Sequence, residues 1–228
     1  MHRWLMCFSM VLLLLSVQQV WGRSAVVPGE IVPTSCQRMA DDSGRGQWPY
    51  NSRLIDGCLL AGGTPFHPKP PANTASHVLE IFERIYDLGI RSVVILNVPV
   101  DDREVRLEEK IAATIGLKTF RLPMNSEKVP TASETEKLLE LIKNKAYVHC
   151  QWGADRTGAI VAKYLRVCHG YSGREAWEAV TKKGSHTGRY GALKLDPKYS
   201  NLVLYFWPEV IHEDLEVCLK YGIPFSKP

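Results

Sequence analysis

The sequence predicts a single α/β domain in which helices flank a central, mainly parallel sheet. Three features support this fold class: short apolar runs typical of buried strands, amphipathic helical segments between those runs, and polar capping residues where the helices begin. Strands that alternate with helices favour a layered, parallel arrangement, because each helix crosses back over the sheet between two strands. The 228 residues are enough for one sizeable core.

The strands are predicted where β-branched and other apolar residues cluster. Residues 92–98 (SVVILNV) form a continuous run of the kind found in sheets that are covered on both faces. Residues 119–122 and 146–149 predict two further strands. Residues 54–61 predict a first strand or two short strands joined by a turn.

The helices are predicted from apolar residues at helical spacing and from signals at helix ends. Val78, Ile81, Phe82 and Ile85 share one helical face. A second helix is predicted to begin at the caps Asp101 and Asp102 and to end at Gly116. Capping boxes at Thr131 and Ser172 predict the start of two more helices, and a further helix over residues 157–168 is expected to end at Gly170. One or two helices are predicted after Pro197.

The first 22 residues predict a secretory signal peptide. Arg3 gives a basic start, residues 4–17 are almost wholly apolar, and the small Gly22 stands near the expected cleavage site. The apolar run is shorter than the roughly 20 residues of a spanning helix, so an uncleaved membrane anchor is the weaker alternative. We therefore expect a secreted or periplasmic protein with no stable membrane insertion after cleavage.

The mature chain is expected to consist of an irregular lead-in and one domain. Residues 23–51 are rich in Pro, Ser, Gly and Asp and show no periodicity, whereas residues 52–228 carry all the predicted elements. Five cysteines follow the signal: Cys36, Cys58, Cys150, Cys168 and Cys218. In an exported protein the pair Cys36 and Cys58 is predicted to form a bridge, and Cys150 to stay free.

Charge and cysteine spacing exclude some classes of function. The formal net charge of +4 falls to +3 once Arg3 is removed, which is too small and too scattered to indicate a nucleic-acid partner. The small positive net charge is compatible with an anionic substrate. No cysteine spacing matches a zinc site, so no zinc is predicted, and no other cofactor is predicted.

Residues 149–157 (HCQWGADRT) carry the chemistry, between a predicted strand and a predicted helix. Such a loop turns backbone N–H groups toward one point, and the helix dipole adds to them, so that an anion such as phosphate is held. Gly153 permits backbone angles that a side chain would forbid. Arg156 offers a planar fork of donors to two phosphate oxygens.

Within this loop, the sequence assigns Cys150 as the nucleophile. Inward N–H groups and a helix start stabilise a thiolate, whose attack on phosphorus would give a phosphocysteine that water hydrolyses. Substrate binding is assigned to Gln151, Trp152, Gly153, Ala154, Asp155 and Arg156. His149 is expected to fix the loop by hydrogen bonding, and the hydroxyl of Thr157 to bond the sulfur as phosphate leaves.

The segment HCQWGADRTG resembles the signature loop of the protein-tyrosine phosphatase superfamily, in its compact dual-specificity-like branch, and a weaker likeness extends over residues 54–182. The resemblance implies a phosphatase-like fold and metal-free hydrolysis of phosphomonoesters. A tyrosine or dual-specificity protein phosphatase is the first expectation. An inositol phosphate or phosphoinositide phosphatase is the alternative, so that the partner is a phosphorylated protein or a small phosphate ester.

The proton donor is the ambiguous part of the site. The resemblance implies an aspartate on a mobile loop, but the matching residues 122–127 (LPMNSE) contain none. Asp155, inside the cradle, is favoured slightly over Glu127 as the general acid. Trp152 either stacks on a ring of the substrate or packs the loop. Ala154 stands where phosphoinositide-directed relatives tend to carry lysine.

Two other classes stay open. A binding module would keep the phosphate cradle but turn over poorly, which the missing loop aspartate would explain. A thiol-redox or sulfur-transfer protein would also use an activated cysteine, but Arg156 and Thr157 favour phosphate, and no Cys-x-x-Cys motif is present.

Oxidation of Cys150 is expected to be reversible, with Cys168 or Cys218 as resolving partner.

Overall fold

The computed structural model describes residues 34–40, 46–67, 73–97 and 102–227. The predicted signal peptide, Asp101 and the end of the strand predicted over residues 92–98 lie outside the described residues. Within the described part, none of the helices combines the length and the apolar character that crossing a membrane requires.

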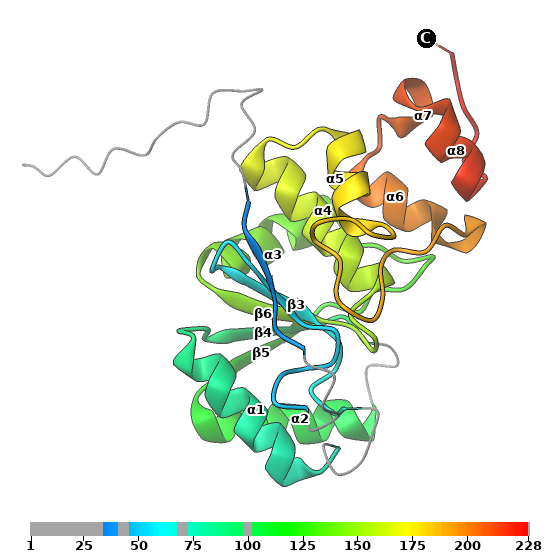
Figure 1. The fold of residues 1–228 in the computed structure, drawn as a ribbon. Coiled ribbons are helices and arrows are strands. Elements are labelled where there is room, and N and C mark those ends of the chain that lie inside the picture. Colours follow the sequence, from blue (N-terminus) through cyan, green and yellow to red (C-terminus); the bar gives the residue numbers. More distant parts are fainter. Residues whose placement is uncertain (1–33, 41–45, 68–72, 98–101, 228) are drawn as a thin grey trace, which may run out of the picture.

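A sheet of six strands forms the centre of the domain, in the order β1-β2-β3-β6-β4-β5 (Figure 1). The strands are β1 (Cys36–Arg38), β2 (Arg53–Ile55), β3 (Leu59–Gly62), β4 (Ser92–Ile95), β5 (Lys118–Arg121) and β6 (Ala146–His149). The four strands β3, β6, β4 and β5 run parallel, whereas β1 and β2 are added antiparallel at one edge. The predicted mainly parallel sheet is therefore confirmed.

Helices cover both faces of the sheet. On one face lie α1 (Ala75–Asp87) and α2 (Arg103–Ile115); on the other lie α3 (Ala132–Lys143), α4 (Asp155–His169) and α5 (Gly173–Val180) (Figure 1). Successive strand residues point to opposite faces of the sheet and so pack into two separate hydrophobic cores. Tyr147 packs with the side chains of α1 and α2, and its neighbour Val148 packs with those of α4. The sheet is thus buried on both faces, as the apolar strand sequences require.

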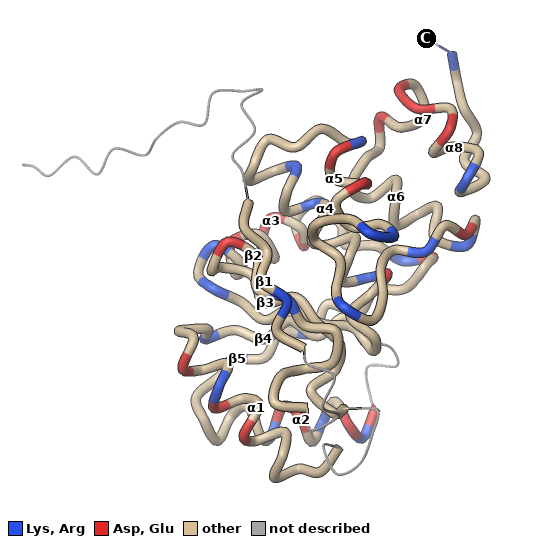
Figure 2. The backbone as a smooth tube through the Cα atoms, viewed as in Figure 1, with Lys and Arg blue, Asp and Glu red and all other residues tan. Residues whose placement is uncertain are grey.

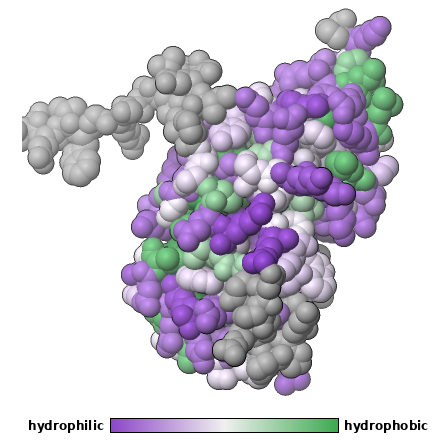
Figure 3. Space-filling model, viewed as in Figure 1, coloured by the Kyte–Doolittle hydropathy of each residue, from purple (hydrophilic) through white to green (hydrophobic). Residues whose placement is uncertain are grey.

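The chain ends in short helical pieces: η1 (Pro197–Tyr199), α6 (Ser200–Phe206), α7 (Val210–Glu213) and α8 (Leu215–Tyr221). This is more than the one or two helices predicted after Pro197. Apolar surface lies over the last of them, where Leu215 and Leu219 are exposed (Figure 3).

The predicted helix ends agree with the structure in most places. Thr131 and Ser172 each make a complete capping box. Gly116 and Gly170 both end their helices in the left-handed conformation. The helix predicted over residues 157–168 begins earlier, at Asp155, so the cradle and the first helical turn overlap.

The lead-in and the cysteines differ from their predictions. Residues 23–51 contain β1, which pairs with β2. The five cysteines of the described chain are all free, and the predicted bridge between Cys36 and Cys58 is not formed. Cys36 lies opposite Ile55 in the ladder, whereas Cys58 lies beyond the end of β2, in the turn before β3.

Candidate functional site

The candidate active site lies at the carboxyl end of β6, where a parallel α/β sheet places its ligands. β6 ends at His149, α4 begins at Asp155, and the loop between them starts with Cys150. Because β3 and β4 flank β6 on either side, the loop sits at the centre of the parallel strands. The Cys150 side chain is buried, with 2% of its surface exposed.

Three successive carbonyl groups of this loop point away from its interior, and each accepts a hydrogen bond. The backbone N–H of Thr64 donates to the Gln151 oxygen (3.3 Å). The Asn51 amide donates to the Trp152 oxygen (3.1 Å), and Arg53 Nη1 donates to the Gly153 oxygen (2.7 Å). The loop is therefore held from outside by β2 and the segments beside it.

This arrangement fixes the direction of the loop's N–H groups. In a planar trans peptide the C=O and N–H point to opposite sides. The N–H groups of Trp152, Gly153 and Ala154 are therefore directed away from their braced carbonyls, and within the described chain none of the three has an acceptor. This is the arrangement that the prediction of an anion cradle requires, and the loop is called the cradle below.

Gly153 is required by this packing. It adopts φ +65°, and a Cβ there would lie 2.4 Å from the backbone of Gly62 and Gly63. The cradle can therefore rest directly on the end of β3 only if residue 153 has no side chain.

Arg156 is half-buried at the edge of the cradle. Its Nη1 donates to the carbonyl oxygens of Leu96 and Met124, both at 3.3 Å. The described residues offer no acceptor to its Nε and Nη2, so this part of the guanidinium remains able to bind phosphate oxygens. The contact with Met124 also places the segment of Glu127 next to the cradle.

His149 and Thr157, at the two ends of the loop, are both held by buried hydrogen bonds. His149 Nε2 lies 2.8 Å from Glu108 Oε1 on α2, and both side chains are almost fully buried. The Thr157 hydroxyl donates to the Gly62 carbonyl at 3.1 Å. In this structure the hydroxyl is thus engaged by β3, an acceptor that the sequence did not reveal, and the bond to the sulfur as phosphate leaves stays a prediction.

Sequence reasoning missed Asn51 and Arg53. Arg53 is 1% exposed and donates to three carbonyls, those of Gly153, Asn51 and His186. Burial lowers its pKa to about 10, and the nearby Cys36 and Cys150 act in the opposite direction. The Asn51 side chain bonds the cradle at Trp152 and accepts from the backbone N–H of Tyr190. The sequence signal for Arg53 was an arginine directly before a predicted apolar strand.

The two candidate proton donors have different surroundings. Asp155 Oδ1 accepts from the backbone N–H of Lys194 at 2.9 Å, which ties the start of α4 to the segment before α6. Glu127 is exposed, in a turn whose backbone N–H groups bond the Asn125 side chain. Asp155 is therefore held in place by a backbone contact, whereas Glu127 is a solvent-exposed side chain.

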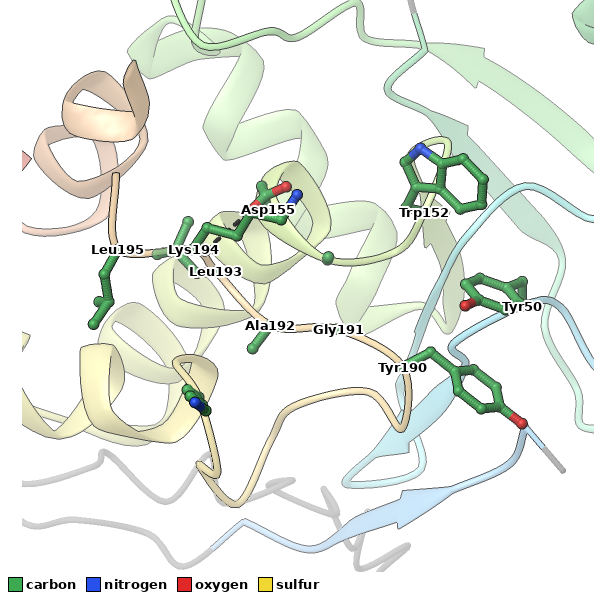
Figure 4. A pocket seen from close by; sticks show the side chains of 11 residues that line it. Tyr50, Trp152, Asp155, Tyr190, Gly191, Ala192, Leu193, Lys194 and Leu195 are labelled. Atoms are coloured by element: carbon green, nitrogen blue, oxygen red, sulfur yellow. Dashed lines mark hydrogen bonds between the residues drawn. The ribbon is translucent and has the colours of Figure 1, made fainter. Parts of the chain in front are cut away.

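A cavity of about 580 Å³ opens beside the cradle (Figure 4). Trp152, Ala154 and Asp155 of the cradle form one side of it. The rest of the lining consists of Tyr50, Lys182 and residues 190–195. Tyr50 stacks on Tyr190, with centroids 4.9 Å apart, and meets Trp152 edge-on. Trp152 is 55% exposed, so it forms part of the rim.

Cys168 and Cys218 are the predicted resolving partners of Cys150. Cys168 is in the last turn of α4, about 20 Å along the helix from Asp155 at 1.5 Å per residue. Cys218 is buried in α8, where its thiol donates to the Val210 carbonyl. Neither is placed to resolve an oxidised Cys150, contrary to the prediction. In the part of the chain that is described, no group of His, Cys, Asp and Glu side chains forms a metal-binding cluster.

Comparison with known families identifies the same region. A family model described as "PTP-SAK: Swiss Army Knife protein, DSP-PTPase phosphatase domain" matches residues 72–195, more than half of the chain. The matched range contains the whole cradle and the segment that lines the cavity.

Two curated relatives are named phosphatidylglycerophosphatase and protein-tyrosine phosphatase 1. The Mus musculus protein is 31% identical and the Rattus norvegicus protein 28% identical, each over 109 residues. These alignments cover 45% of this chain and 56% of each relative, so the chain spans just over half the length of the relatives it matches. The crystal structure of P. aeruginosa TpbA is 17% identical with a TM-score of 0.50, and covers 82% of this chain and 94% of that chain. It shows a shared fold.

Proposed function

Because the chain belongs to the DSP-PTPase phosphatase family, we propose that it is a cysteine-dependent phosphomonoester hydrolase. One observation carries this proposal: Thr64, Asn51 and Arg53 hold three successive carbonyls of the loop after Cys150, and the N–H groups of the same peptides have no acceptor among the described residues. An oxyanion is the ligand such a cradle stabilises most.

The reaction proceeds in two displacements. Cys150 Sγ, as thiolate, forms a bond to phosphorus while the bond from phosphorus to the ester oxygen breaks, and that oxygen takes a proton from the general acid. Water then attacks the phosphocysteine, the sulfur–phosphorus bond breaks, and phosphate leaves with the thiolate restored. The cradle N–H groups and Arg156 stabilise the charge on the phosphoryl oxygens in both steps.

The substrate class we propose is a phosphorylated tyrosine, or a serine or threonine, of a protein. The mouse and rat relatives are named for both a protein-tyrosine phosphatase and a phosphatidylglycerophosphatase, so a lipid-type phosphate is the second candidate, and of this class an inositol phosphate or phosphoinositide. Ala154 gives no cationic side chain for a strongly acidic head group, which favours the protein substrate. We also propose that the enzyme is exported by its predicted signal peptide.

Phosphate release from an aryl phosphate tests the proposal. The wild-type protein is expected to turn over in the presence of a chelator, whereas Cys150→Ser is expected to be inactive but still to bind vanadate. Turnover by Cys150→Ser, or turnover that stops on chelation, would refute the mechanism. Tight vanadate binding by a wild-type protein that does not turn over would identify a binding module instead.

A further inference from the structure

The cavity beside the cradle extends well beyond the residues that would hold the phosphate. Its lining includes Trp152, Ala154 and Asp155, but not Cys150 or Arg156. A substrate whose phosphate sits in the cradle would therefore extend its remaining part into this cavity. The volume of about 580 Å³ is in the range of ligand sites that hold an organic group.

The cavity is built before any ligand arrives. Its far wall, residues 190–195, is fixed at three backbone positions: Tyr190 N–H to Asn51 (2.7 Å), Leu193 N–H to Val180 O (3.0 Å) and Lys194 N–H to Asp155 (2.9 Å). Figure 4 shows this wall facing the cradle, with the aromatic rings of Tyr50, Trp152 and Tyr190 at one end. A preformed wall loses little entropy on binding.

The same wall belongs to the most basic stretch of the domain. Residues 181–198 contain five Lys or Arg and one Asp, which gives +4, equal to the net charge of the whole chain. Figure 2 shows these basic positions spread along the connection between α5 and α6. Lys182 and Lys194 line the cavity itself, and Asp155 is the single carboxylate among the lining residues. An acidic ligand complements this charge.

The apolar part of the lining indicates what kind of acidic ligand fits. Ala192 and the exposed Leu195 contribute apolar side chains, which would leave the hydroxyl groups of a highly hydroxylated ring without hydrogen-bond partners. A second hollow, of about 260 Å³, continues from the first and shares Lys182 and Leu195 with it. Two hollows in series accommodate an extended chain better than a compact polyol.

We propose that this cavity binds the polypeptide segment that flanks the phosphorylated residue, with an acidic side chain of that segment held by Lys182 and Lys194 and an apolar one packed against the exposed Leu195. The inference rests on the proposed function, and it makes the enzyme selective for phosphoproteins with acidic and apolar residues next to the phosphorylation site.

Binding to the Cys150→Ser variant tests this without any need for turnover. Fluorescent phosphotyrosyl peptides with Asp and Leu on either side of the phosphotyrosine are compared by anisotropy with peptides in which Lys replaces Asp. The acidic peptides are expected to bind about tenfold more tightly, and Lys182→Glu with Lys194→Glu to remove most of that ratio, since each exposed ion pair contributes modestly. Lys118→Glu, an exposed charge reversal on β5, is the matched control and should keep the ratio.

Equal affinity for both peptides, or a ratio that survives the double charge reversal, would overturn the inference. Tighter binding of an inositol bisphosphate than of the acidic peptide, with the same dependence on the two lysines, would overturn it as well. The proposed function fails by a different result, namely a wild-type protein that releases no phosphate from any ester.

Discussion

Arg53 Nη1 donates a 2.7 Å hydrogen bond to the carbonyl oxygen of Gly153, so a fully buried guanidinium lies directly behind the phosphate-binding loop. The other acceptors of Arg53 are the carbonyls of Asn51 and His186. This side chain joins β2, the cradle and the segment that follows α5.

Replacement of Arg53 should damage both stability and catalysis. Arg53→Met leaves three carbonyls without their donor, and we expect a loss of about 2 kcal/mol in the free energy of unfolding. We also expect kcat/KM to fall by about tenfold or more, because the Gly153 peptide is no longer held. Arg53→Lys should rescue only part of this, since an ammonium cannot reproduce the planar fork.

Arg121→Met is the matched control for these measurements. Arg121 lies on the edge strand β5, and its replacement breaks the 2.6 Å ion pair with Glu109 of α2, which involves no residue of the cradle. Its kcat/KM should stay close to that of the wild type. A wild-type kcat/KM in Arg53→Met would show that the cradle keeps its shape without this brace.

Two glycine substitutions should have opposite effects. Gly153→Ala forces a Cβ to 2.4 Å from the Gly62 backbone at a positive φ, so a loss of more than about 2 kcal/mol is expected, together with loss of vanadate binding. Gly158→Ala, in α4, meets nothing closer than 3.7 Å and should raise stability by up to about 1 kcal/mol. Denaturant unfolding measures both. Equal stability of the two variants would contradict the close contact between the cradle and β3.

The general acid can be identified by comparing rates for substrates with different leaving groups. An alkyl phosphate needs protonation of its leaving oxygen, whereas a nitrophenolate leaves without help. If Asp155 is the acid, Asp155→Asn slows alkyl esters within the roughly 10²–10⁴-fold range of such catalysis and affects aryl esters much less. Glu127→Gln should slow both little.

The contact between Asp155 and Lys194 N–H offers a second outcome. Equal slowing of both ester types in Asp155→Asn would mark this residue as one that positions the cradle, since damage to phosphate binding is felt by every substrate. Discrimination by Glu127→Gln alone would place the acid on the exposed turn.

His186 should make the fold weaker in mild acid. Burial, and then the charges of Arg53 and His169, lower its pKa below the ordinary 6.5. The unfolded chain therefore takes up a proton at His186 as the pH falls below about 6.5, while the folded chain does not, so the stability present above that pH is progressively lost.

Thermal unfolding measured from pH 7.5 down to pH values below 6.5 tests this effect. The fall in Tm should be smaller in His186→Gln than in the wild type, whereas His212→Gln, at an exposed position, should follow the wild type. An unchanged pH dependence in His186→Gln would show that its proton uptake is not linked to folding.

The central features of the fold could be predicted because they are local in the sequence. The apolar strands, the capping boxes at Thr131 and Ser172 and the glycine stops each depend on a few neighbouring residues. The position of Cys150 between a strand and a helix also follows from local pattern. These features together determine where the cradle lies.

The supporting residues could not be predicted, because their contacts join distant parts of the chain. Asn51 and Arg53 bond residues about 100 positions away, and Thr157 finds its acceptor at Gly62. β1 has only three residues and takes its structure from pairing with β2. No local periodicity marks a residue whose role is to satisfy a carbonyl elsewhere.

Detection of a phosphoryl group on Cys150 tests the central claim most directly. Wild-type protein is mixed with an aryl phosphate labelled at phosphorus, stopped within milliseconds in denaturant and digested for peptide mapping. We predict that the label is found on the peptide that contains Cys150 and is absent when Cys150→Ser is treated in the same way. Turnover with the label on another residue, or equal labelling of Cys150→Ser, would contradict the proposed phosphocysteine mechanism.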